Sequence, residues 1–384
     1  MIKRPLPKAV WLFGAVSLLN DAASEMVTPL IPVLVTSVLA ASPTVLGFIE
    51  GLAEATASVL KYVAGRWVDR GASPKAMILG GYGFSNLLRP VMGLVHAWPL
   101  VAALRFGDRI GKGLRTAPRD AWISASVDAD QRGRAFGVHR AADHLGAFLG
   151  PIAAFALLSI GWDVQQVFVI SCIPGFLLIL LLGVALSRIG VPEFAKRGPV
   201  APASYSSRLK KLMWALIMVT AGSVPDAFLV LYAQEAGVAV AYIPLLWAAA
   251  HLVKAWMVAK VGAWSDTWGR NPVLRMCWLA RIAVLMLLMI GNTAEWSVWV
   301  LFVVYLAVSG STESVERAMV GDLARADMKA SSFGLFHMST GLAALPGAVL
   351  FGWVWQTYGM ATAVVMAALF TLTGTLLLQR LLRS

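Results

Sequence analysis

The chain alternates long apolar stretches with short polar connections, and this pattern predicts membrane-spanning helices. The run VFVISCIPGFLLILLLGVAL at 167–186 has the roughly 20 apolar residues that a helix needs to cross a hydrocarbon core of about 30 Å. The whole chain contains twelve predicted spans, at residues 10–39, 44–66, 75–95, 98–123, 134–159, 164–187, 210–233, 240–263, 272–292, 295–323, 331–357 and 361–381. We therefore expect an all-α integral membrane protein with twelve transmembrane helices.

The composition agrees with a membrane protein and disagrees with a soluble one. The 384 residues are 59% hydrophobic and 14% charged, whereas a soluble domain carries roughly a quarter charged residues. Such an apolar excess exceeds what cores of ordinary size can bury. Cys172 and Cys277 lie in different apolar spans, which predicts neither a disulfide nor a metal site built on cysteine.

Basic residues are confined to alternate connections between the predicted spans. Six connections contain no Lys or Arg, those near Ala41, Ala97, Gly161, Ala236, Thr293 and Gly359. The intervening connections and both termini hold the basic residues, which is the positive-inside pattern of a protein with both termini in the cytoplasm. The net charge of +12 is thereby explained without a nucleic-acid partner. We expect a multi-pass protein of a bacterial-type inner membrane.

Three separate segments repeat at one offset of 197 residues, which indicates a duplication. GRWVD at 65–69 returns as GAWSD at 262–266, Phe136-Gly137 as Phe333-Gly334, and Ala121 as Ala318. Six spans per copy give both copies the same orientation, so we expect two parallel, pseudo-symmetric six-helix bundles with a site between them at mid-depth. The predicted domains are an N-terminal bundle (1–190), a cytoplasmic linker (191–209) and a C-terminal bundle (210–384).

Two parallel halves of six spans, with a G-x-x-x-D-R turn after the second span, resemble the major facilitator superfamily. Gly65, Asp69 and Arg70 match the turn, although GASPK after them lacks the second Gly-Arg pair of the family pattern. The second copy keeps four positions of the pattern but has Thr267 in place of the first Arg; these positions are Gly262, Asp266, Gly269 and Arg270. The resemblance implies a cytoplasmic gate formed by Gly65, Asp69, Arg70, Gly262, Asp266 and Arg270.

The fifth span carries a second element of this family. GAFLGP, from Gly146 to Pro151, resembles a glycine-proline pattern associated with antiporters that export their substrate, with Ala153 and Ala154 replacing its last two glycines. Gly146 and Gly150 offer a small face for close helix packing, and Pro151 bends the helix. The alternative is close packing alone.

The stretch RFGDRIGKGLRTAPRD at 105–120 concentrates charge in the fourth span. Its charged residues at steps of three and four share one helical face, namely Arg105, Asp108, Lys112, Arg115 and Arg119. Charges at this depth need water or a partner, which predicts a cavity wall; for Arg115 and Arg119 the alternative is a side chain that simply reaches the cytoplasmic surface. The family has an Arg near the start of this span, which implies a cavity-facing or proton-relay role for Arg105. The following glycines, Gly111 and Gly113, come two positions later than in the family.

Further charged residues inside the spans are functional candidates, some of which are expected to form structural ion pairs instead. A carboxylate shielded from water can exchange a proton near neutral pH, and the proton-coupling candidates are Asp21, Glu25 and Asp143. The substrate-binding candidates are Arg105, Asp108, Lys112, Arg140, Asp226, Glu313, Glu316 and His337.

The resemblance implies a secondary active transporter that moves a small organic solute by alternating access. Proton-coupled export by antiport is the first hypothesis, and proton-coupled uptake of an anionic or zwitterionic solute by symport is the second. A membrane-embedded enzyme and a non-transporting receptor are the alternatives from other classes; His139 and His144, five residues apart, are poorly spaced for a metal on a helix. We expect no enzyme activity, cofactor or metal. The expected partners are the solute, protons and the lipid bilayer, and the family implies a monomer.

Overall fold

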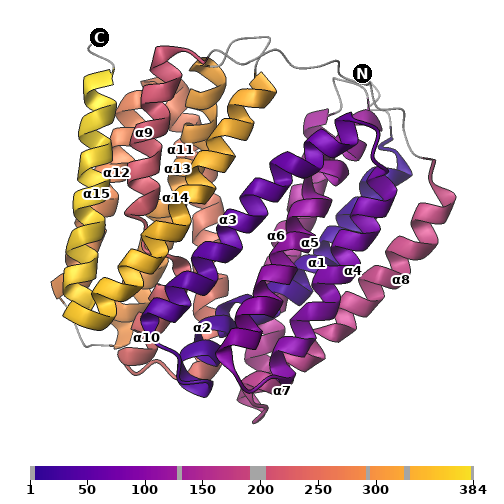
Figure 1. Cartoon of the computed structure of the whole chain (residues 1–384), viewed down its shortest axis with the longest axis horizontal. Helices are drawn as coiled ribbons and strands as arrows, with labels where there is room; N and C mark the ends of the chain where they lie inside the picture. Colours follow the sequence, from indigo (N-terminus) through magenta and orange to yellow (C-terminus); the bar gives the residue numbers. More distant parts are fainter. Residues whose placement is uncertain (1–4, 128–131, 191–204, 291–294, 324–328, 382–384) are drawn as a thin grey trace. The chain divides into compact units, whose positions relative to one another are not determined.

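The computed structural model describes residues 5–127, 132–190, 205–290, 295–323 and 329–381, and within these ranges every regular element is a helix. The first half contains α1 (Lys8–Val27), η1 (Thr28–Leu30), α2 (Ile31–Val33), the π-helix η2 (Leu34–Val38), α3 (Pro43–Asp69), α4 (Pro74–Val91), η3 (Met92–Leu94), α5 (Trp98–Ala125), α6 (Arg132–Ser159), α7 (Val164–Ile170) and α8 (Cys172–Arg188). The second half contains α9 (Ser207–Ala221), α10 (Asp226–Glu235), η5 (Val240–Tyr242), α11 (Ile243–Trp268), α12 (Arg270–Ile290), α13 (Glu295–Leu323), α14 (Lys329–Tyr358) and α15 (Met360–Leu381) (Figure 1).

Each predicted span corresponds to one long helix or to consecutive shorter helices. In the described part of the chain, nine segments are long and apolar enough to cross a membrane by length and composition. The remaining three predicted spans are α3, α4 and α5, which carry charged residues inside apolar sequence. Together they are the twelve helices of an all-α membrane protein built from two six-helix bundles, which confirms the predicted fold class.

Contacts divide the chain into two compact units that differ from the repeat in one place. Unit 1 comprises residues 1–34 and 56–199, and unit 2 comprises residues 35–55 and 200–384. The first part of α3 therefore packs with unit 2, although the repeat assigns all of α3 to residues 1–190. The cause is a close approach to α14, because a Cβ added at Gly51 of α3 would lie 2.8 Å from Leu345 Cα.

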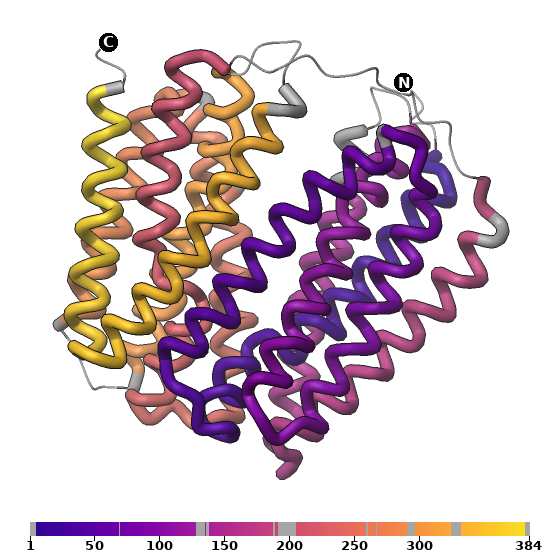
Figure 2. The backbone as a smooth tube through the Cα atoms, in the orientation of Figure 1, coloured from indigo at the N-terminus to yellow at the C-terminus, as the bar shows by residue number. Residues whose placement is uncertain are grey.

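The first helix of each half is interrupted near a proline. In unit 1, α1 ends at Val27 and the chain continues through η1, which contains Pro29. In unit 2, α9 ends at Ala221 and α10 begins at Asp226, directly after Pro225. A proline lacks the N–H that would continue the helical ladder, so the helix is broken at both places. The tube in Figure 2 traces the chain through both interruptions.

Contacts inside each unit extend the 197-residue repeat from sequence to packing. A Cβ added at Gly65 of α3 would lie 3.6 Å from Ala117 Cβ of α5. A Cβ added at Gly262 of α11 would lie 3.1 Å from Ser314 Oγ of α13, and both members of this pair are 197 residues further on. The contact of α3 with α5 in the first half therefore has its equivalent in the contact of α11 with α13 in the second half.

A second pair of contacts follows the offset but changes its chemistry. Gly113 of α5 packs against α3, where an added Cβ would collide with Leu60 Cβ and lie 3.3 Å from the carbonyl oxygen of Ala57. The equivalent Gly310 of α13 packs against Lys254 of α11, whose aliphatic carbons occupy the space beside the glycine. The duplicated fold thus places a charged side chain in unit 2 where unit 1 has a methyl group.

The predicted glycine face of the fifth span lies against the backbone of α1. A Cβ added at Gly146 of α6 would lie 3.0 Å from the nitrogen of Ala22, and one at Gly150 would lie 2.8 Å from the nitrogen of Met26. Pro151 follows inside α6. Because the neighbours are backbone atoms, which have no rotamer freedom, the two helices would have to separate to accept any side chain here.

We predict that Gly150→Ala lowers the stability of the protein by about 1–3 kcal/mol, the usual cost of forcing extra methyl groups into a packed interface. The matched control is Gly183→Ala in α8, where an added Cβ meets nothing within 4 Å. Thermal unfolding of both variants in detergent measures the difference. Equal melting temperatures would contradict the close approach of α6 to α1.

Candidate functional site

A buried ionic cluster surrounds Asp108 in α5. Arg89 Nε of α4 lies 2.9 Å from Asp108 Oδ1, while Arg105 Nη1 and Arg109 Nε lie 3.7 Å and 3.8 Å from Oδ2. The Asp108 side chain is 1% exposed and that of Arg89 is 3% exposed. A buried charge is tolerated only when it is paired and hydrogen-bonded, so one carboxylate here compensates several cations. Of the predicted charged stripe, Asp108 therefore contacts Arg89 of α4, and Arg105 contacts Asp108.

Two glycines let α4 and α5 approach closely enough to build this cluster. A Cβ added at Gly81 would lie 2.7 Å from the carbonyl oxygen of Gly111. Beside them, Ser85 Oγ donates to the backbone oxygen of Asp108 and accepts from Arg115 Nη1, both at 2.8 Å. The Arg115 guanidinium also lies over the Tyr82 ring, 4.5 Å from its centroid, where the ring quadrupole attracts a cation.

Asn20 of α1 links this cluster to a predicted proton-coupling residue. Arg89 Nη1 donates to Asn20 Oδ1 at 3.3 Å and to Asn86 Oδ1 at 3.2 Å. The amide nitrogen of Asn20 donates in turn to Asp21 Oδ1 at 2.9 Å. A hydrogen-bonded path thus leads from Asp21 through Asn20 and Arg89 to Asp108.

The three predicted proton-coupling carboxylates lie near one another. Asp21 interacts electrostatically with Glu25, with Asp143 of α6 and with Lys112 of α5. Asp21 is thus influenced by two other acids and by one lysine, and groups of acids inside membrane helices are typical of proton relays. The chemistry available to this group is the uptake and release of a proton.

Asp143 has its own partners at one end of this group. Ser17 Oγ donates to its carboxylate, and His139 Nδ1 and Arg140 Nη1 both lie 3.6 Å from Oδ2. His139 is buried, whereas the Arg140 side chain is 63% exposed. Arg140, a predicted substrate-binding residue, lies at the exposed side of Asp143.

Unit 2 contains a polar, partly open cavity of about 200 Å³ beside the break between α9 and α10. Three of the predicted substrate-binding residues line it: Asp226 from α10, and Glu313 and Glu316 from α13. Lys254 of α11 and Arg281 of α12 line it as well. The cavity therefore presents three carboxylates and two cationic groups to anything that enters it.

An ion pair in this cavity depends on Gly310. Lys254 Nζ lies 2.9 Å from Glu313 Oε1, and Arg317 Nη2 lies 3.5 Å from Glu313 Oε2. Lys254 reaches this position with its aliphatic carbons against Gly310, where a Cβ would collide with them. The glycine sets the path of the lysine across α13.

Arg281 and Tyr305 hold the interrupted backbone at the wall of the cavity. Arg281 Nη2 donates to the carbonyl oxygens of Val219 at 3.2 Å and Gly222 at 2.7 Å. Tyr305 Oη accepts from the Val224 nitrogen at 3.0 Å. These bonds satisfy backbone groups that the broken helix leaves without helical partners. Among the described atoms, the buried Arg281 Nε has no hydrogen-bond partner.

The remaining predicted residues lie at other places. His337 is half-buried on α14. Among the predicted gate residues, Arg70 is exposed after α3, and Arg270 Nε lies 3.3 Å from Asp322 Oδ2. The side chains of Asp69 and Asp266 lie outside the described part of the structure. In the ranges that the structure describes, no group of three or more His, Cys, Asp or Glu side chains is placed to hold a metal ion.

Sequence reasoning missed Arg89 and Arg281, the two arginines that organise the ionic cluster and the cavity wall. Each is a basic residue inside an apolar span, and this signal was sufficient to mark them as candidates. It also missed Asn20 and Tyr305, which carry no charge and give no signal in a hydropathy pattern.

We predict that Asp108→Asn destabilises the protein by about 3–5 kcal/mol, because it leaves buried arginines without their counter-charge. The matched control is Asp120→Asn on the same helix. Asp120 is 43% exposed and pairs with Arg119 at 2.9 Å, so its loss is expected to cost less than about 1 kcal/mol. Melting temperatures in detergent test the order; a control as unstable as Asp108→Asn would refute it.

Comparison with known proteins gives relatives over nearly the full length of the chain. An uncharacterized MFS-type transporter of Methanocaldococcus jannaschii is 29% identical over 382 residues, which cover 98% of this chain and 95% of the relative. Among solved structures, a mutant of the nucleoside transporter NupG has a TM-score of 0.80 at 13% identity, over 97% of this chain and all of that one.

A bacterial homologue of the human lysosomal transporter Spinster has a TM-score of 0.79 at 14% identity, over 97% of this chain and 96% of that one. At these identities the structural likeness establishes the fold. The sequence model of the Major Facilitator Superfamily matches residues 13–312. The chain, with its twelve helices, duplicated halves and transporter-like fold, belongs to the Major Facilitator Superfamily of membrane transporters.

Proposed function

We propose that this transporter exports a small organic solute in exchange for protons, by alternating access. The observation that carries the proposal is the position of Asp21 in unit 1, where it interacts with two further carboxylates, Glu25 and Asp143, and with Lys112. Burying an acid inside a membrane helix costs free energy. Such acids are therefore rare, and they often mark ion and proton pathways. The site lies in the bacterial inner membrane with both termini cytoplasmic, and one chain is sufficient.

Asp21 is the proton carrier in this mechanism. When Asp21 is ionised, it attracts Lys112 and accepts a hydrogen bond from Asn20; when it is protonated, the attraction to Lys112 is lost. Asn20 also accepts a hydrogen bond from Arg89, and Arg89 pairs with Asp108. A change in the bond between Asp21 and Asn20 therefore affects both of these contacts. Protonation thereby alters the forces between α1, α4 and α5, which is the coupling that a proton-driven transporter needs. Arg105 and Asp108 act in this network and do not contact the solute directly.

Support for export comes from the packing of α6 on α1. Gly146 and Gly150 lie against the backbone around Ala22, immediately beside Asp21. A glycine-proline element of the antiporter type thus fixes the helix that carries the proton site. Any movement of α6 is transmitted to α1 because backbone contacts yield less than side-chain contacts.

The cavity of unit 2 suggests a solute that carries both charges. Asp226, Glu313 and Glu316 suit a cationic group, and Arg281, through its Nε–H, suits an anionic one. A volume of about 200 Å³ is below the roughly 300–1,000 Å³ of pockets for drug-sized ligands. A small zwitterionic metabolite therefore fits this cavity best. In this mechanism the two repeated turns form the cytoplasmic gate, with Gly65, Asp69 and Arg70 in the first half and Gly262, Asp266 and Arg270 in the second.

We predict that everted membrane vesicles holding a respiration-driven pH gradient release protons when the right pool of solutes is added, and that Asp21→Asn abolishes the release. Pools of zwitterionic, anionic and cationic compounds are followed with a pH-sensitive dye. The matched control, Asp163→Asn, removes a carboxylate that caps α7 and leaves an equally good cap. We expect it to retain full activity.

Proton release that survives in Asp21→Asn would remove Asp21 from the mechanism. A complete lack of response to every pool, with the protein confirmed in the membrane, would favour uptake by symport. Accumulation of radiolabelled solutes in whole cells then tests that alternative. Both results leave the family membership intact.

We also predict that Gly310→Ala reduces the proton release of the active pool by about tenfold or more, without lowering the amount of protein in the membrane. The added Cβ displaces Lys254 from Glu313, and misplacing one charged contact typically costs at least about 1.4 kcal/mol. Gly321→Ala on the same helix is the control, because its Cβ would be 3.6 Å from Phe333, an ordinary contact. Equal activity of both variants would exclude Lys254 from the site.

A further inference from the structure

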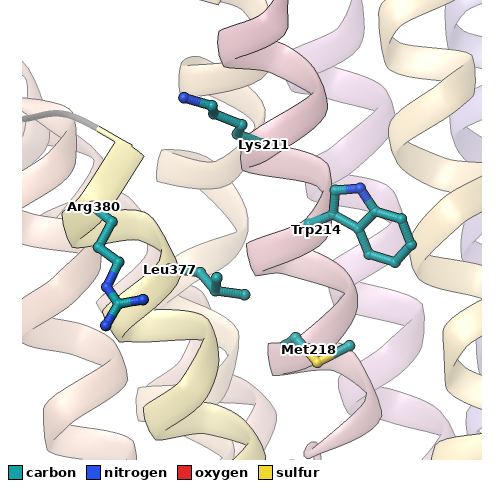
Figure 3. A pocket seen from close by; sticks show the side chains of 5 residues that line it. All are labelled: Lys211, Trp214, Met218, Leu377 and Arg380. Carbon is teal, nitrogen blue, oxygen red and sulfur yellow. The ribbon is translucent and has the colours of Figure 1, made fainter. Parts of the chain in front are cut away.

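Two helices of unit 2 border a groove of about 490 Å³ on the surface of the unit. Lys211, Trp214 and Met218 line it from α9, and Leu377 and Arg380 line it from α15 (Figure 3). The helices are neighbours, and α9 begins at the same end of unit 2 at which α15 ends (Figure 1). Lys211 lies near the beginning of α9 and Arg380 near the end of α15, so both basic residues belong to the same end of unit 2, beside an otherwise apolar groove.

The groove opens away from the core of unit 2. Lys211, Trp214 and Met218 follow one another at steps of three and four, which places them on one face of α9. Leu212 and Leu216 on the opposite face are buried in the hydrophobic core. The Trp214 side chain is 62% exposed, and in a membrane protein such an apolar outer face contacts lipid.

The charges around the groove all have the same sign. Arg208 and Lys210 add to Lys211 at the beginning of α9, and neither Ser207–Ala221 nor Met360–Leu381 contains an Asp or Glu. The positive-inside pattern assigns this end to the cytoplasmic leaflet, whose anionic lipids attract basic residues near the membrane surface. Positive charge and apolar surface thus meet at the depth where a phospholipid changes from headgroup to acyl chain.

We propose that this groove binds one anionic phospholipid. Its phosphate lies between Lys211 and Arg380, and an acyl chain runs along Trp214, Met218 and Leu377 toward the bilayer centre. A second copy of the chain is a poorer occupant, because a two-fold axis along the membrane normal would bring like charges of the two copies together. The lipid site is separate from the cavity of unit 2 and does not depend on the proposed transport.

The test measures lipid retained by the full-length protein in detergent. Phosphatidylglycerol and phosphatidylcholine with identical chains are titrated separately, and bound lipid is counted by native mass spectrometry. We expect tight retention of one phosphatidylglycerol, weakened about 30-fold in the double variant Lys211→Gln/Arg380→Gln, from two basic contacts of ordinary strength. The matched control Arg208→Gln/Lys210→Gln removes the same charge from exposed positions outside the groove and is expected to weaken binding far less.

A second readout locates the acyl chain. Phosphatidylglycerol with brominated chains quenches nearby tryptophan fluorescence, and we expect Trp214→Phe to remove a quenchable component that Trp296→Phe, an exposed tryptophan on α13, leaves in place. Equal losses in both double variants would indicate general attraction and overturn the site. Equal retention of phosphatidylcholine, or a dimer in place of bound lipid, would overturn it as well.

Discussion

The need to compensate charge inside a membrane protein governs this structure, and Asp108 is its clearest case. One carboxylate that is 1% exposed offsets nearby arginines, and Arg89 also donates to the side-chain amides of Asn20 and Asn86. Without this arrangement, α5 could not carry five basic residues through an apolar bundle. The close glycine contact of α4 with α5 exists because these groups must meet within hydrogen-bonding distance.

The same constraint explains why the proposed proton site is connected to the rest of unit 1. Asp21 lies near other acids, and it accepts a hydrogen bond from Asn20, which itself accepts one from Arg89. A change in protonation therefore alters a network that already spans three helices. In unit 2 the network is smaller and more open, and it surrounds a cavity.

The fold was predictable from the sequence because hydropathy and the 197-residue repeat report on every span. The charged face of α5 was predictable as well, since helical spacing places Arg105 and Asp108 on one side. Their role was not, because spacing does not say whether a face meets water or arginine. Arg89 comes from another helix, 19 residues away, and only packing brings it to Asp108. The path of Lys254 over Gly310 likewise depends on the approach of α11 to α13.

The equivalence of Gly113 and Gly310 has a consequence for how the two halves diverged. Both glycines leave a small space beside the neighbouring helix, occupied by Leu60 and the backbone of Ala57 in one half and by the stem of Lys254 in the other. A duplicated scaffold can therefore acquire new chemistry in one copy by a single replacement, with no change of backbone. The room beside a glycine can thus accept side chains of different size and charge, and the two halves of a transporter can become chemically different while their backbones stay nearly symmetric.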